Sequence, residues 1–333
     1  MNVVTPKTEI IEQKSGLQGI YEQIELAGRV CYASEHNIKY DEEGNSTTAE
    51  GFVDRLIKSR HTSVLEHGTV YLKFSTKLNN LGKEDSTWLP EGDYFNNPYS
   101  RVITIREVVD SPKYLIDPVI THYFITTNMR VLVENDWLED LKYLCEPTEY
   151  HEKRVTVRFT TDIGITREAN RHRKNSISES STRYCNYAND RFGNELSICS
   201  NSDFNEEEIK KKLKSWNYPD RSSAFYNMCD HIAHYENEEQ FEIIDYWLFA
   251  NLASEWSYMN LIRLGWKPQQ ARRILPLDTK SELIHTAFIS DWEHFFRLRS
   301  SLAETGQPHP DMKFLIDPLY KEFVSRNYIE LLK

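Results

Sequence analysis

The fourteen residues from Arg171 to Tyr184, RHRKNSISESSTRY, concentrate positive charge and hydroxyl groups in a chain that is otherwise acidic. Four cationic side chains and a histidine surround one carboxylate, Glu179, and five serine or threonine hydroxyls, whereas the 333-residue chain has a formal net charge of -11. Arginine side chains bind phosphates and carboxylates bidentately, and hydroxyls add further hydrogen bonds. The stretch therefore predicts a pocket for a small anion, although its composition also suits a basic helix end followed by a polar loop in water.

The composition limits the class of protein. Hydrophobic residues make up 39% and aromatic residues 12%, enough for a sizeable core. The acidic balance argues against a general nucleic-acid binder. No apolar run reaches the roughly 20 residues of a membrane span, and the first residues lack an apolar signal core, so we expect a cytoplasmic protein without membrane contact. The five cysteines are odd in number and lack a CxxC pair, which predicts no disulfide framework, no metal site and a reducing compartment.

The hydrophobic pattern predicts strands in the first half of the chain and mostly helices in the second. Residues 154–163 (RVTVRFTTDI) alternate most clearly, and residues 69–76 and 121–128 also suit strands. Residues 77–103 read as a long irregular segment. Helices are expected over 13–34, 49–60, 129–145, 165–173, 222–265 with a break near Glu238, 268–275, 289–301 and 310–327. The serines after 173 are expected to form a loop. This order of elements predicts an α+β fold.

The opening stretch resembles the signature of the flavin-dependent thymidylate synthases, RHR-x-x-S-x-N-E-x-S-x-R-Y. One position departs from it, because Ser178 stands where the signature has asparagine. The positions in register are Arg171, His172, Arg173, Ser176, Glu179, Ser181, Arg183 and Tyr184.

Other segments also resemble this family. RHTSVLEHGTVYLKF resembles its H-x-[TS]-x-x-E-H element, with Ser63 near the flavin, although His61 and His67 taken alone are more typical of surface histidines than of a metal site. ARRILP places Arg272, and ISDWEHFFRLRSS places Arg299. LAGRVCYAS, which places Arg29, is a weaker match. The resemblance covers residues 13–76 and 150–326, which predicts one domain over 1–333 with an insertion at about 77–149.

The resemblance implies an activity, a fold and an assembly. Members convert dUMP to dTMP with carbon from methylenetetrahydrofolate and hydride from reduced FAD, which NADPH regenerates, and they need no protein nucleophile. The implied fold is a small mixed or antiparallel sheet flanked by helices. The implied assembly is a homotetramer with sites at subunit junctions, in which Arg171 and the serine loop come from different chains.

The resemblance also implies roles for individual residues. Arg299 would be catalytic, since it would stabilise charge that builds on the uracil ring. The expected dUMP contacts are Glu168, Arg171, Glu179, Ser180, Ser181, Arg183, Arg272 and Arg299. The expected FAD contacts are Ser63, Arg171, His172, Arg173, Lys174, Glu179 and His294. Glu179 could accept from a ribose hydroxyl or a flavin N–H, or could pair with Arg183.

Three further positions, outside the signature, depart from the family pattern. Glu168 stands where many relatives have a glutamine that contacts the substrate. Phe288 and His294 take the places of two asparagines on the late helix that commonly face the flavin, and a phenyl ring cannot replace an amide. These departures leave open a family member that binds FAD without turnover.

Two other classes of protein are also open. One is a cysteine-dependent synthase, although Cys185 is expected to be only a small, partly buried thiol. The other is a nucleotide- or nucleic-acid-binding protein without catalysis, in which REANRHRK would enter a groove.

Overall fold

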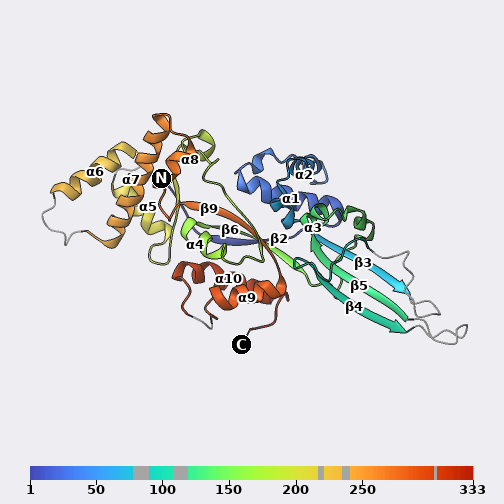
Figure 1. Cartoon of the computed structure of the whole chain (residues 1–333). Coiled ribbons are helices and arrows are strands. Elements are labelled where there is room, and N and C mark those ends of the chain that lie inside the picture. Colours follow the sequence, from blue (N-terminus) through green and yellow to red (C-terminus); the bar gives the residue numbers. More distant parts are fainter. Residues whose placement is uncertain (78–89, 109–118, 217–220, 235–240, 304–305, 333) are drawn as a thin grey trace, which may run out of the picture.

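The computed structural model describes residues 1–77, 90–108, 119–216, 221–234, 241–303 and 306–332. Its centre is a four-stranded antiparallel sheet (Figure 1). The strand order is β2 (Lys7–Ile11), β6 (Arg154–Asp162), β9 (Lys280–Phe288) and β7 (Ser176–Glu179). Helices cover both faces of this sheet, so the expected α+β class with a small antiparallel sheet is confirmed.

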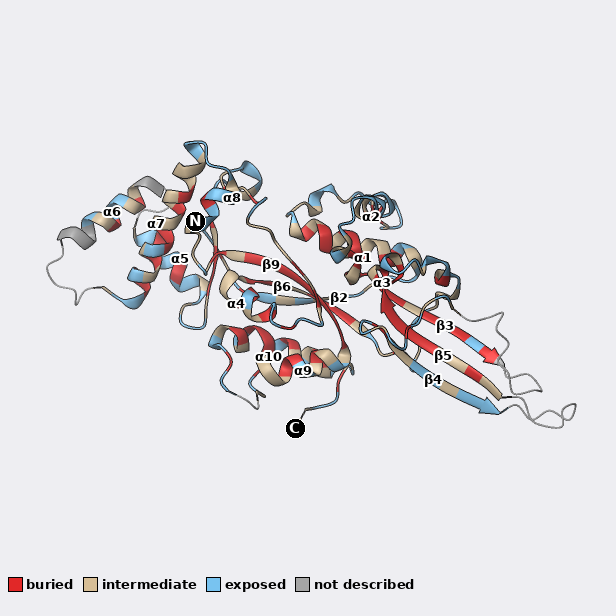
Figure 2. Ribbon diagram, viewed as in Figure 1, coloured by how far each residue is buried: buried red, intermediate tan, exposed pale blue. Residues whose placement is uncertain are grey.

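The two middle strands differ in how clearly the sequence predicts them. β6 is the expected strand, and Val155, Val157 and Phe159 all lie in the core on one face of the sheet. β9 was not expected. It is buried on both faces from Leu283 to Phe288, so its sequence lacks the alternation of a half-exposed strand (Figure 2).

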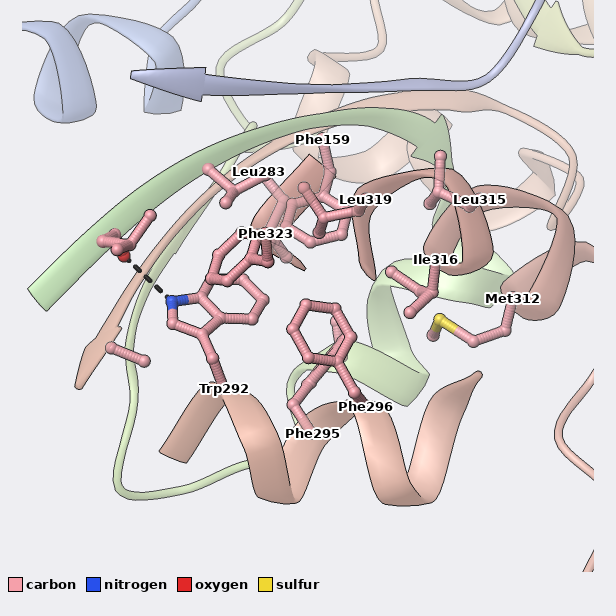
Figure 3. Packing of buried hydrophobic residues seen from close by; sticks show 14 of the residues in the cluster. Phe159, Leu283, Trp292, Phe295, Phe296, Met312, Leu315, Ile316, Leu319 and Phe323 are labelled. Atoms are coloured by element: carbon pink, nitrogen blue, oxygen red, sulfur yellow. Dashed lines mark hydrogen bonds between the residues drawn. The ribbon is translucent and has the colours of Figure 1, made fainter. Parts of the chain in front are cut away.

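The largest core lies between one face of the sheet and two C-terminal helices, α9 (Ile289–Arg299) and α10 (Pro310–Ser325) (Figure 3). Trp292 is fully buried there, and its indole Nε1 donates to the Val155 carbonyl at 3.0 Å. Phe323 of α10 packs against the same indole, with ring centroids 5.2 Å apart. The short helix α4 (Ile163–Ala169) also contacts β6 and β9.

The opposite face of the sheet is covered by α1 (Gly16–Cys31) and the 3-10 helix η2 (Thr62–His67), with α2 (Ala49–Lys58) packed on α1. The layer beneath η2 is polar. Thr156 and Thr286 pair their hydroxyls at 2.8 Å, and buried His67 hydrogen-bonds with Thr286.

A second antiparallel sheet extends from one side of the central body as an arm (Figure 1). Its order is β3 (Thr69–Lys77), β5 (Val119–Asn128) and β4 (Arg101–Val108), and β4 is exposed toward its outer end (Figure 2). The irregular segment expected over 77–103 therefore ends in a strand, and its residues 78–89 lie outside the described part. The helix expected over 129–145 is shorter: α3 covers Met129–Glu134, and a separate 3-10 helix, η4, covers Leu138–Tyr143.

The other end of the molecule is mostly helical. It contains α5 (Glu206–Ser215), α6 (Arg221–His234), α7 (Ile243–Arg263) and α8 (Pro268–Ala271). β1 (Asn2–Val4) pairs in parallel with β8 (Ser197–Cys199) beside them. The 3-10 helices η1, η5 and η7 cover Glu35–Asn37, Asp190–Phe192 and Arg272–Ile274. The break expected near Glu238 lies outside the described residues. Within the described ranges, no helix has the length and apolar character to cross a membrane.

Candidate functional site

The RHR triplet lies in the turn between α4 and β7. Asp162 caps α4 by accepting from the Ile165 amide at 2.8 Å, and the helix ends at Ala169, so the expectation of a helix to residue 173 was too long. The serines beyond were expected to form a loop, but Ser176–Glu179 form β7 along the edge of β9. A serine-rich segment can form a strand here because its hydroxyls bond to buried groups, such as Ser178 with His67 at 2.9 Å.

This turn faces α9 across an open cleft of about 640 Å³. The structure thus brings together predicted FAD residues from two distant segments. The side chains that line the cleft are Arg171, His172, Arg173, Lys174, Asn175, Asp291, His294, Leu298 and Arg299. Four of the nine are cationic at neutral pH, so the cleft attracts an anion such as a phosphate.

Arg299 is held in a fixed position at the end of this cleft. It forms an ion pair with Glu168, and its Nη2 donates to the Glu168 carbonyl at 3.2 Å. Its Nε donates to His172 Nε2 at 3.2 Å. Burial, with contributions from the nearby Arg299 and His294, lowers the pKa of His172 to about 4. The His172 ring is therefore neutral at pH 7 and can accept from the guanidinium.

Glu179 connects three elements. Its carboxylate accepts from Thr166 Oγ1 at 2.7 Å, from Asn170 Nδ2 at 2.9 Å and from Ser281 Oγ at 3.1 Å. These contacts tie α4 to β7 and β9. The possible pairing of Glu179 with Arg183 is not observed among the described contacts.

The remaining predicted dUMP residues lie at the other end of β7. The Ser180 amide donates to the Glu282 carbonyl, and the Ser181 amide donates to the Cys31 carbonyl, each at 2.8 Å. Arg272 reaches this loop, where its Nη1 donates to Thr182 Oγ1 at 3.2 Å. The loop after β7 and the nearby Arg272 thus contain four of the predicted dUMP residues: Ser180, Ser181, Arg183 and Arg272. Because each strand residue spans about 3.3 Å, the four residues of β7 separate the backbone of Ser180 from the cleft by roughly 13 Å.

Ser63 does not line the cleft. It is exposed on η2, above the face of the sheet opposite to α9. In the same element His67 was expected at the surface, and this was wrong. The ring is fully buried and hydrogen-bonds with Ser178 and Thr286, both at 2.9 Å. Burial, with a contribution from Arg154, lowers the pKa of His67 to about 3.

Phe288 was expected on the late helix, but it is the last residue of β9 and directly precedes α9. It is 6% exposed, and the guanidinium groups of Arg101 and Arg154 lie 4.4 and 5.5 Å from its ring centroid. His294 does lie on α9 and lines the cleft. Sequence reasoning missed Asp291 and Leu298, although each is one helical turn from His294 and therefore shares its face.

Cys185 is buried beside the signature, as a small structural thiol would be. Burial raises the pKa of its thiol to about 11, so the thiolate that a cysteine-dependent synthase needs is disfavoured at this position.

The family model described as thymidylate synthase complementing protein matches residues 16–77 and 147–323. The chain belongs to this family. The match confirms the resemblance that the signature suggested, and the unmatched residues 78–146 include β4 and β5 of the arm.

Solved structures give a weaker likeness. The UMP/dUMP methylase PolB from Streptomyces cacaoi, bound with 5-Br dUMP, is 15% identical, with 98% of this chain and 93% of that chain covered and a TM-score of 0.39. Thymidylate synthase ThyX from Helicobacter pylori, with FAD and dUMP, is 12% identical, with 98% and 100% covered and a TM-score of 0.35. The family assignment rests on the sequence match, because both TM-scores are low. The comparison with curated proteins found no match.

Proposed function

We propose that this chain is a flavin-dependent thymidylate synthase that methylates dUMP to dTMP, with methylenetetrahydrofolate as carbon donor and NADPH as reductant. The observation that carries the proposal is the cleft, in which the RHR turn and α9 bring cations and two histidines together in a chain of this family. Relatives support the ligand assignment, since the Helicobacter pylori ThyX structure contains FAD and dUMP.

The residues of the cleft fit FAD. Arg171, Arg173 and Lys174 can neutralise the pyrophosphate, and the volume of about 640 Å³ accommodates a large part of a dinucleotide. His172 in the turn and His294 on α9 line opposite walls of the cleft, where their rings can pack against the flavin or the adenine. When bound there, reduced FAD supplies the hydride for the reaction.

Arg299 is the residue we assign to the chemistry. Uracil C5 is a poor nucleophile until negative charge builds on the ring, and a guanidinium near the N3/O2 edge stabilises that charge. The ion pair with Glu168 and the hydrogen bond to His172 fix the direction of this guanidinium before substrate arrives. Glu168 therefore acts here by holding Arg299, a role that glutamine would perform without a charge.

The dUMP phosphate and sugar are assigned to Ser180, Ser181, Arg183 and Arg272. They lie together, and in one chain the backbone of Ser180 is separated from the cleft by roughly 13 Å, a distance set by the length of β7. A homotetramer, with the loop of one chain placed against the cleft of another, unites the two groups in one site. In the same assembly, the exposed Ser63 can contact the flavin bound by a neighbouring chain.

The visible spectrum of the purified protein tests this function. We expect flavin absorption bands that bleach on anaerobic addition of NADPH, and faster bleaching once dUMP is present. A protein that stays colourless after incubation with FAD contradicts the proposal. Flavin that binds but is not reduced faster with dUMP instead supports a family member without turnover.

A further inference from the structure

One carboxylate stands among the cations of the cleft. Of the described residues that line it, Asp291 in the first turn of α9 is the one with a carboxyl group. Its side chain is 20% exposed and lines the cleft, so part of it is accessible to a ligand. The neighbouring walls offer mainly donors, namely the guanidinium and ammonium groups of the RHRK turn and of Arg299.

Asp291 is held by a residue from the arm. Arg101, at the start of β4, places its Nη2 3.7 Å from the Asp291 carboxylate and its Nε 3.4 Å from Glu152. Glu152 in turn accepts from the amide of Ser290, at 3.2 Å, and from its hydroxyl. The Arg101 guanidinium also lies over the ring of Phe288, 4.4 Å from the centroid. Asp291, Phe288 and Glu152, the last of which is bonded to Ser290 of α9, therefore fix this one arginine.

Arg101 belongs to the part of the chain that the family match leaves out, residues 78–146. The inner end of the arm therefore contacts the wall of the cleft, through Arg101 and Asp291. A change at Arg101 would release Asp291 while leaving the core around Trp292 in place.

A dinucleotide bound in this cleft needs hydrogen-bond acceptors from the protein as well as hydrogen-bond donors. FAD carries sugar hydroxyls on its ribityl chain and its ribose, and each hydroxyl loses a hydrogen bond to water when it is buried. A carboxylate that accepts from a hydroxyl forms a short, charge-assisted hydrogen bond. In a cleft lined by cations, the carboxylate of Asp291 is the acceptor best suited to this role.

We propose that Asp291 accepts a hydrogen bond from a sugar hydroxyl of FAD bound in the cleft, and that Arg101 of the arm is the positioning residue that holds Asp291 for it. This inference rests on the proposed function. It adds a contact from outside the signature and gives the arm a part in cofactor binding.

Fluorescence titration of the full-length apoprotein with FAD tests the inference. Asp291→Ala is expected to weaken FAD binding about tenfold, as the loss of one charge-assisted hydrogen bond would. Arg101→Ala is expected to weaken it less, about fivefold, and Arg101→Lys to restore part of the loss. The double variant should bind within about twofold of Asp291→Ala, because Arg101 acts through Asp291.

Two variants serve as matched controls. Arg106→Ala removes an exposed arginine farther along β4, and Glu293→Ala removes a carboxylate of α9 that does not line the cleft. Both should bind FAD like the wild type, and thermal unfolding of each apoprotein should verify that the variants are folded.

The possible failures can be told apart. If the wild type binds FAD but Asp291→Ala and Arg101→Ala bind it equally well, or if their effects simply add, the inference is overturned and the proposed function stands. If the wild type has no affinity for FAD, the proposed function and this inference both fail.

Discussion

At the scale of single residues, His67 joins three elements through its two ring nitrogens. It sits on η2 and hydrogen-bonds with Ser178 on β7 and Thr286 on β9, in a fully buried position. His67→Ala would remove one hydrogen-bond partner from each of two buried hydroxyls, those of Ser178 and Thr286, and would open a cavity. We expect it to lower the free energy of unfolding by about 2–4 kcal/mol, measured by urea denaturation. The exposed Ser63→Ala on the same helix should change it by less than about 0.5 kcal/mol, and equal stability of the two variants would contradict this role.

The buried histidines also predict how stability depends on pH. Burial lowers the pKa of His172 to about 4 and of His67 to about 3, and lowers that of His285 well below its ordinary value. The unfolded chain therefore binds more protons than the folded chain as the pH falls below about 6.5, so the folded state loses stability in that range. Each histidine contributes up to about 1.4 kcal/mol per pH unit.

Urea unfolding at pH 7.5, 6 and 5 measures this dependence. The midpoint should fall steadily toward pH 5, and the slope should be shallower in His67→Gln, which lacks one of the titrating groups. A midpoint that is the same at pH 5 and pH 7.5 would rule out the buried, neutral histidines.

At the scale of elements, the contact between α9 and β6 sets the position of the cleft wall. Trp292 anchors α9 through a fully buried indole that donates to the Val155 carbonyl. Trp292→Phe loses that hydrogen bond and part of the packing, so we expect a loss of about 2–3 kcal/mol in denaturant unfolding. Phe314→Leu, at a position 53% exposed on α10, is the matched control and should cost less than about 0.5 kcal/mol. Equal losses in the two variants would show that the indole does not anchor α9.

The sequence predicts some elements well and others poorly, for physical reasons. β6 alternates the core residues Val155, Val157 and Phe159 with polar residues on its other face, so its pattern is visible in the sequence. β9 is covered on both faces from Leu283 to Phe288, so buried polar residues stand among its apolar ones and no alternation is visible in its sequence. β7 is rich in serine and resembles a loop, because the hydroxyl partners that stabilise it, such as His67, are distant in the chain.

The candidate site was predicted in the same uneven way. The signature identified the RHR turn, and the resemblance of residues 289–301 identified Arg299; the fold brings the two together around one cleft. The signature did not include Asp291, which shares a helix face with His294 but belongs to no motif. Nor could it reveal Arg101, whose contact depends on how the arm meets α9.

At the scale of the whole molecule, the separation of the two groups of site residues predicts complementation between chains. Arg299→Ala removes a cleft residue, and Arg183→Ala removes a residue of the loop beyond β7. Each variant alone should be inactive. If sites form between chains, random mixing in equal amounts restores one intact site in about four, and therefore about a quarter of the wild-type activity.

Co-expression of the two variants with different affinity tags, followed by isolation of the mixed oligomer, measures this recovery. The matched control mixes Arg299→Ala with Arg171→Ala, two changes in the same cleft, and should stay inactive. Absence of recovery in the first mixture would contradict a site shared between chains.

The central claim is that this chain methylates dUMP with a flavin and without a protein nucleophile. Release of tritium from dUMP labelled at C5 tests it most directly, in the presence of FAD, NADPH and methylenetetrahydrofolate. We predict release together with dTMP formation by the wild type and by Cys185→Ser, and loss of at least about a hundredfold in Arg299→Ala. No release by an FAD-loaded wild type, or release that Cys185→Ser abolishes, would contradict the account.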